Sequence, residues 1–114
     1  MEASTDLIRL KALADPTRLG IVEFLSTSCC GSATLNDEGG VIGPTAGEVC
    51  CHITGVSKVS STISHHLHEL ADAGLIKLER RGKSMACNLE PEALRATADY
   101  LLRLATQTSE AKCC

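Results

Sequence analysis

Cysteine thiols are the side chains of this 114-residue chain with the most distinctive chemistry. Six of the seven cysteines form adjacent pairs, Cys29-Cys30, Cys50-Cys51 and Cys113-Cys114, and Cys87 stands alone. Three soft thiolates around one centre suit trivalent arsenic or antimony, whose lone pair takes the fourth position. Thiolates also bind zinc, cadmium, lead or mercury, with four ligands preferred for zinc. The pairs therefore predict a site for a soft, thiophilic ion.

One pair cannot complete such a site by itself. Adjacent residues on a helix point about 100° apart, so two neighbouring ligands require local distortion and a third must come from elsewhere. For Cys50-Cys51 the favoured third ligand is Cys29 or Cys30, which the loop that follows them could bring back. Cys113 or Cys114, from the same chain or a partner, is the competing source. The alternative interpretation is that the cysteines are ordinary small buried residues.

Two further residues have an ambiguous relation to this site. Cys87 falls in an expected strand, where it is either an additional thiol or an inert strand residue. His52 follows Cys50-Cys51 and could join the thiolates around zinc or cadmium.

Composition and charge indicate in which compartment, and with which partners, these thiols are found. No apolar run approaches the about 20 residues of a membrane span, and the start Met1-Glu2-Ala3 differs from a secretory signal. We therefore expect a cytoplasmic protein without a membrane partner, in which the cysteines are thiols, metal ligands or redox groups rather than a disulfide framework. The net charge is −3, but residues 58–83 carry +2 and three histidines, which permits phosphate binding by that segment.

The elements that must position the thiols follow from apolar spacing and from Pro and Gly breaks. In chain order we expect a helix from Ser4, a helix from Asp15-Pro16 to about 26–30, a flexible inserted loop over 31–46, a short helix from Ala46 to about Ile53, a helix capped by Ser57 and running to Ala73, a β-hairpin of 75–80 and 84–89 around Arg81-Gly82-Lys83, and a last helix over 91–107. The order predicts a mostly α fold with a β-hairpin wing, a winged helix-turn-helix.

In such a fold the helix over 57–73 is the recognition helix, which lies in the major groove of DNA. The residues expected to contact DNA are short hydroxyl or imidazole side chains on this helix and basic side chains of the wing: Ser60, Ser61, Thr62, Ser64, His65, Arg80, Arg81 and Lys83. His66, close to the apolar face, is expected to be a packing or capping histidine. The alternative is that these polar groups are only solvated surface.

Six segments in this order resemble the ArsR/SmtB family of metalloregulatory repressors over almost the whole chain. They are residues 10–22 (LKALADPTRLGIV), 47–51 (GEVCC), 63–67 (ISHHL), 73–76 (AGLI), 81–83 (RGK) and 89–91 (LEP). The resemblance implies a homodimer, paired through the first and last helices, that binds operator DNA and leaves it when an inducing ion binds.

The resemblance also implies that Cys50 and Cys51 belong to the site that binds the inducing ion. In arsenic-sensing members the cysteines come directly after a Gly-Glu pair, and here they come one residue further on, after Val49. Family members that sense zinc use histidines and carboxylates of the last helix, and residues 91–107 contain no histidine.

The expected function is therefore a dimeric repressor over 1–106, with a polar cysteine-ended tail over 107–114, released from DNA by arsenite or antimonite. Within this class the alternatives are a divalent soft metal or thiol oxidation as the trigger. Outside it, a metal chaperone without DNA binding remains open. A redox enzyme would need a Cys-x-x-Cys that the chain lacks, and neither enzymatic activity nor a small organic substrate is expected.

Overall fold

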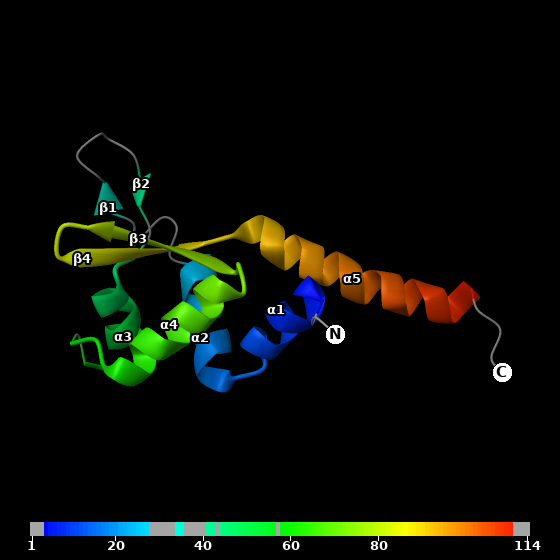
Figure 1. Cartoon of the computed structure of the whole chain (residues 1–114), viewed down its shortest axis with the longest axis horizontal. Helices are drawn as coiled ribbons and strands as arrows, with labels where there is room; N and C mark the ends of the chain where they lie inside the picture. Colours follow the sequence, from blue (N-terminus) through cyan, green and yellow to red (C-terminus); the bar gives the residue numbers. More distant parts are fainter. Residues whose placement is uncertain (1–3, 28–33, 36–40, 43, 57, 111–114) are drawn as a thin grey trace.

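Helices form most of the molecule, and a β-hairpin projects from them (Figure 1). The computed structural model describes residues 4–27, 34–35, 41–42, 44–56 and 58–110. Within them the elements are α1 (Thr5–Leu13), α2 (Pro16–Thr27), β1 (Thr34–Leu35), β2 (Val41–Ile42), α3 (Ala46–Thr54), α4 (Ser61–Asp72), β3 (Ile76–Arg81), β4 (Ser84–Leu89) and α5 (Pro91–Glu110).

The helices start where a side chain accepts a hydrogen bond from one of the first free backbone N–H groups. The Ser4 hydroxyl accepts from the N–H of Leu7 at 3.1 Å, and the Asp15 carboxylate accepts from the N–H of Arg18 at 3.0 Å. At α3 the Thr45 hydroxyl accepts from the N–H of Glu48 while the Glu48 carboxylate reaches back to the N–H of Thr45, which is a capping box.

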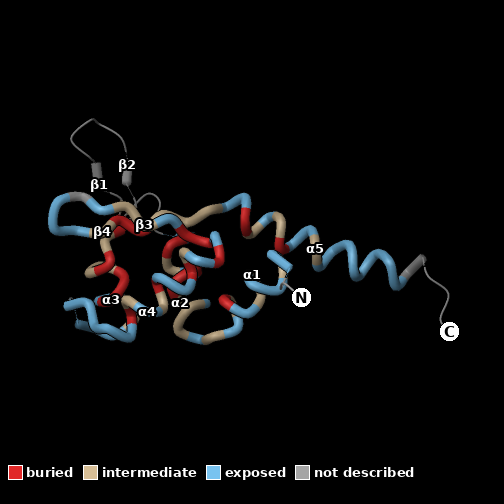
Figure 2. Tube along the Cα trace, in the orientation of Figure 1, coloured by how far each residue is buried: buried red, intermediate tan, exposed pale blue. Residues whose placement is uncertain are grey.

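The core lies where α2, α3 and α4 meet the hairpin. It is built from aliphatic side chains and two thiols, because the chain offers few aromatic rings. Helix α4 contributes Ile63, Leu67 and Leu70, and the buried residues in Figure 2 gather at this junction.

Strands β3 and β4 form the wing, an antiparallel hairpin paired from Ile76↔Leu89 to Arg81↔Ser84. The two-residue turn Gly82-Lys83 closes it, and Gly82 has a φ of +61°, which a side chain would strain. A mostly helical chain with this hairpin after a helix-turn-helix pair confirms the predicted winged helix-turn-helix.

Helix α5 extends away from this body, and its second half is exposed (Figures 1 and 2). Leu101 and Leu102 are 48% and 62% exposed. In the part of the chain that the structure describes, no helix is both long and apolar enough to cross a membrane.

Two predicted helix boundaries were wrong. Helix α4 is capped by Ser60 rather than Ser57, because the Ser60 hydroxyl accepts from the N–H of Ile63 at 3.1 Å. Val59 consequently precedes the helix and is 38% exposed. Helix α5 continues to Glu110, since nothing between 107 and 110 breaks a helix.

The segment 31–46 is not all loop. Thr34–Leu35 pairs with Val41–Ile42, a result in keeping with the strand preference of β-branched residues. Thr45 forms a bridge to Ala86 of the wing, and Ala46 already belongs to α3. Arg81, expected in the turn, is the last residue of β3.

Candidate nucleic-acid interface and thiol site

The first turns of α4 carry the polar residues that sequence reasoning assigned to DNA. Ser61, Thr62 and His65 are exposed, and Ser64 is half-buried. The Ser60 hydroxyl is engaged as the helix cap, so Ser60 has a structural role as well. The exposed hydroxyls of Ser61 and Thr62 are available to phosphates or base edges, and the exposed His65 imidazole lies 3.7 Å from the Glu69 carboxylate on the same helix.

Basic residues of the wing lie beside this helix. Arg80 and Lys83 are exposed on either side of the turn, and neither forms an ion pair among the described residues. The Arg81 side chain lies outside the described part of the chain. The wing therefore presents unpaired positive charge, the group that phosphates attract most strongly.

Helix α4 is tied to the α1–α2 corner by a polar contact. The Arg18 guanidinium lies 3.1 Å from Nδ1 of His66 and donates to the carbonyl of Ala12 at 2.8 Å. The hydrogen bond from the Arg18 N–H lowers the pKa of the Asp15 carboxyl, against the opposing effect of partial desolvation, and the charges of His66 and Arg18 lower it further. His66 is thus a packing histidine, as predicted, and it joins α4 to α2.

Cys50 is buried beneath the turn that leads into α4. Its side chain is 1% exposed, and its Sγ donates to the carbonyl of Lys58 at 3.4 Å. The Thr54 hydroxyl, 3.5 Å from the same sulfur, donates to the carbonyl of Cys50 and accepts from the N–H of Val56. The thiol is therefore part of the hydrogen bonding that shapes the α3–α4 turn.

Cys51 has the opposite environment, because it is exposed on the outer face of α3. The two sulfurs of this pair thus face different surroundings. Cys29, Cys30, Cys113 and Cys114 lie outside the described residues, and among the residues that are described no group of three metal-ligating side chains comes together.

Cys87 and His52 have packing partners instead. Cys87 is fully buried in β4, where desolvation, with a smaller contribution from the charge of Glu48, raises the pKa of its thiol to about 12. This keeps the thiol protonated, as an inert strand residue would be. The His52 ring stacks on Phe24, with centroids 4.3 Å apart.

Sequence reasoning missed Arg18, Thr54 and Lys58, which connect α4 to its supports. Arg18 and His66 are 48 positions apart, so no local pattern pairs them. Lys58 takes part through its backbone carbonyl, which no side-chain motif reveals.

No protein-family model and no curated sequence matches the chain. Its fold matches solved structures over nearly the full length. An ArsR family transcriptional regulator superposes with a TM-score of 0.69 at 23% identity, covering 96% of this chain and 100% of that one. A protein described as a possible transcriptional regulator for arsenical resistance gives 0.58 at 25% identity, covering 91% and 96%. The transcriptional repressor BigR from Xylella fastidiosa gives 0.54 at 23% identity, covering 94% and 87%.

Proposed function

We propose that this chain, which has the fold of ArsR-family transcriptional regulators, is a dimeric cytosolic repressor that leaves its operator when trivalent arsenic or antimony binds cysteine thiolates. The observation that carries the proposal is the hydrogen bond from the Cys50 thiol to the Lys58 carbonyl, in the turn that starts the recognition helix. A sensor thiol placed there affects the DNA-binding element directly.

DNA binding is supported by the surface that α4 and the wing share. Ser61, Thr62 and His65 would reach base edges and phosphates, and Arg80 and Lys83 would hold the flanking backbone. In a dimer, two α4 helices would contact half-sites about one helical turn apart.

Dimerisation is supported by apolar side chains that the chain leaves in solvent on two adjacent helices. Leu7 and Ile8 of α1 are exposed, as are Leu101, Leu102 and Leu104 of α5. Solvent-exposed leucines grouped on neighbouring helices are typical of a surface that a partner covers. The family resemblance pairs copies through these same two helices.

The switch would follow from the burial of Cys50. An ion can bind this sulfur only if the thiol loses its proton and leaves the Lys58 carbonyl, since the sulfur is enclosed as it stands. Cys51 would supply a second thiolate, and Cys29 or Cys30, or else Cys113 or Cys114, the third. The turn would then lose its support, and the two recognition helices their common spacing.

This coupling requires the ion to prefer the form released from DNA. Coupling free energies between two sites typically change affinity by about 5- to 150-fold. Because phosphate contacts dominate affinity for DNA, displacing α4 by part of a turn is sufficient for an effect of this size.

The test measures binding to a labelled DNA fragment from upstream of the chain's own gene, with reduced protein, by fluorescence anisotropy. Arsenite should weaken binding by about 10- to 100-fold. Cys51→Ser should bind DNA normally and lose the response. Cys50→Ser keeps a donor for the Lys58 carbonyl and should also lose the response, whereas the matched control Cys87→Ser should keep it.

Normal release of the Cys50→Ser, Cys51→Ser double variant by arsenite would contradict the proposed site. Parallel titrations with antimonite, cadmium, mercury, lead and zinc, and with a thiol oxidant, separate the metalloid from the divalent-metal and redox triggers. A reduced, ion-free protein that binds no DNA would favour a metal chaperone.

A further inference from the structure

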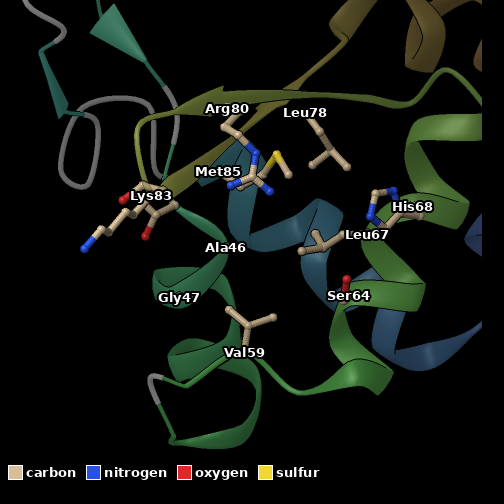
Figure 3. A pocket seen from close by; sticks show the side chains of 12 residues that line it. Ala46, Gly47, Val59, Ser64, Leu67, His68, Leu78, Arg80, Lys83 and Met85 are labelled. Carbon is tan, nitrogen blue, oxygen red and sulfur yellow. The ribbon is translucent and has the colours of Figure 1, made fainter.

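A cavity of about 360 Å³ lies between the recognition helix and the wing, beside the start of α3 (Figure 3). None of its described lining residues is a cysteine, so these residues are not part of the proposed thiol switch. Cavities of this size hold small organic molecules in other proteins.

The inner side of the cavity is apolar. Leu67 of α4 is almost fully buried, and Leu78 and Met85 of the wing strands are half-buried. Figure 3 shows Leu67 and Leu78 converging from one side and Val59 pointing in from below. These walls would remove an apolar group of a ligand from water, which is favourable in proportion to the area covered.

The outer side carries one positive charge aimed inward. In Figure 3 the Arg80 guanidinium lies beside the Met85 sulfur and faces the cavity, while Lys83 extends outward from the rim. Among the described residues Arg80 forms no ion pair. Ser64 and His68 of α4 add further hydrogen-bonding groups. A planar guanidinium favours a carboxylate, which it can bind through two parallel hydrogen bonds.

We propose that this cavity binds a small organic carboxylate with an apolar body, its carboxylate on Arg80 and its body against Leu67, Leu78 and Met85. A bare inorganic anion would leave the apolar wall in contact with water. An uncharged apolar molecule would leave the guanidinium without a partner. The two walls together therefore select an amphiphilic anion.

Such a ligand would compete with DNA. The Arg80 guanidinium cannot hold a ligand carboxylate and a DNA phosphate at the same time, and the ligand would bind between the two elements that contact DNA. Binding of the carboxylate would therefore lower the affinity for DNA without any thiol, independently of the response to the ion. This consequence rests on the proposed function, but binding of the ligand does not.

The experiment follows the methyl group of Met85 by NMR in the full-length protein. The chain has two methionines, Met1 and Met85, so selective ¹³C labelling gives a probe inside the cavity that is simple to assign. The probes are benzoate, its uncharged analogue benzamide, and inorganic phosphate. Benzoate should shift the Met85 methyl signal saturably, and benzamide should bind at least about tenfold more weakly, since it lacks the charge.

Variants locate the ligand. Arg80→Gln should weaken benzoate binding at least about tenfold, and Leu78→Trp, which fills the cavity, should abolish it. Arg95→Gln removes a similar charge from exposed α5 and should bind benzoate like the wild type. If Leu78→Trp fails to fold by circular dichroism, the Arg80 and Arg95 variants decide the question. Equal binding of phosphate or benzamide, no saturable shift, or unchanged affinity in Arg80→Gln would overturn the proposal.

A second arm tests the competition. Saturating benzoate should weaken DNA binding about tenfold, equally in the wild type and in the Cys50→Ser, Cys51→Ser variant. Benzoate binding without any effect on DNA would overturn the competition alone. If the protein binds no DNA, the proposed function fails, while the methyl titration still decides whether the cavity is a ligand site.

Discussion

Helices α4 and α5 both separate an apolar face from a polar face. The chain buries this face along α4, but on α5 it buries residues of the first half only, Ala93 and Thr97. The apolar residues of α4, Ile63, Leu67 and Leu70, are each at most 3% exposed. On α5, Leu101 and Leu102 remain about half exposed or more, and the helix leaves the body of the molecule (Figure 2).

This difference in burial shows which helix is positioned by contacts within one chain and which is not. The orientation of α4 against the wing and α2 is fixed within the chain, by its core contacts and by the link from Arg18 to His66. The surroundings of the outer half of α5 are not fixed in this way. The proposed dimeric repressor would need both features: an α4 held firmly within each chain to contact DNA, and an exposed face on α5 for the partner chain.

The largest effect is expected where α4 meets the core. Leu70 is fully buried, so Leu70→Ala removes buried methyl groups and leaves a cavity, and it should lower the free energy of unfolding by about 2–5 kcal/mol. The measurement is urea unfolding followed by circular dichroism over a range of protein concentrations. Leu102→Ala, the matched change on α5, should lower stability only where the protein self-associates. Equal losses at every concentration would mean that the two helices are held alike.

The next effect concerns the exposed face of α5. Leu102→Glu places a charge on this surface and should weaken self-association by about 2 kcal/mol or more, roughly 30-fold. Sedimentation equilibrium measures the change. Val56→Glu, at a similarly exposed apolar residue in the α3–α4 turn, is the control and should leave association unchanged. A wild-type protein that stays monomeric at high concentration would refute the dimer.

Most of the fold could be predicted because its boundaries are marked by residues with strong local preferences. Pro16 starts a helix, and Gly74 and Gly82 occupy backbone conformations with positive φ that other residues avoid. The start of α4 could not be settled locally, since Ser57, Ser60 and Ser61 are all competent caps. In the structure the Ser60 hydroxyl takes this role by accepting from the N–H of Ile63.

The candidate site was predictable only in part for a related reason. Helix geometry predicts that Cys50 and Cys51 face different ways, but not which of them is buried. The contact of Cys50 with the Lys58 carbonyl and the cavity at Arg80 depend on how α3, α4 and the wing pack. These contacts form between segments that are far apart in the sequence, and no local sequence pattern links such segments.

The smallest expected effect is on the pH dependence of stability, and it tests whether water reaches the core beneath α4. Cys87 belongs to the same buried cluster as Leu67 and Leu70, and burial raises the pKa of its thiol from 9.0 to about 12. Below pH 9 the thiol is protonated in both the folded and the unfolded chain, so it adds no pH dependence. Above pH 9 the thiol ionises in the unfolded chain only, which favours unfolding until the folded thiol ionises near pH 12.

The wild type should therefore lose about 1.4 kcal/mol of stability at pH 10, relative to pH 8, that Cys87→Ala does not lose. The measurement is urea unfolding at both pH values and one protein concentration. Comparing the two proteins cancels the ionisation of lysines and Tyr100. Cys51→Ala removes an exposed thiol and should keep the pH dependence of the wild type. Equal losses of stability in the wild type and in Cys87→Ala would mean that water reaches the Cys87 thiol in β4. The core beneath α4 would then be less well shielded from water than the burial of Cys87 indicates, and its contrast with the exposed face of α5 would be smaller.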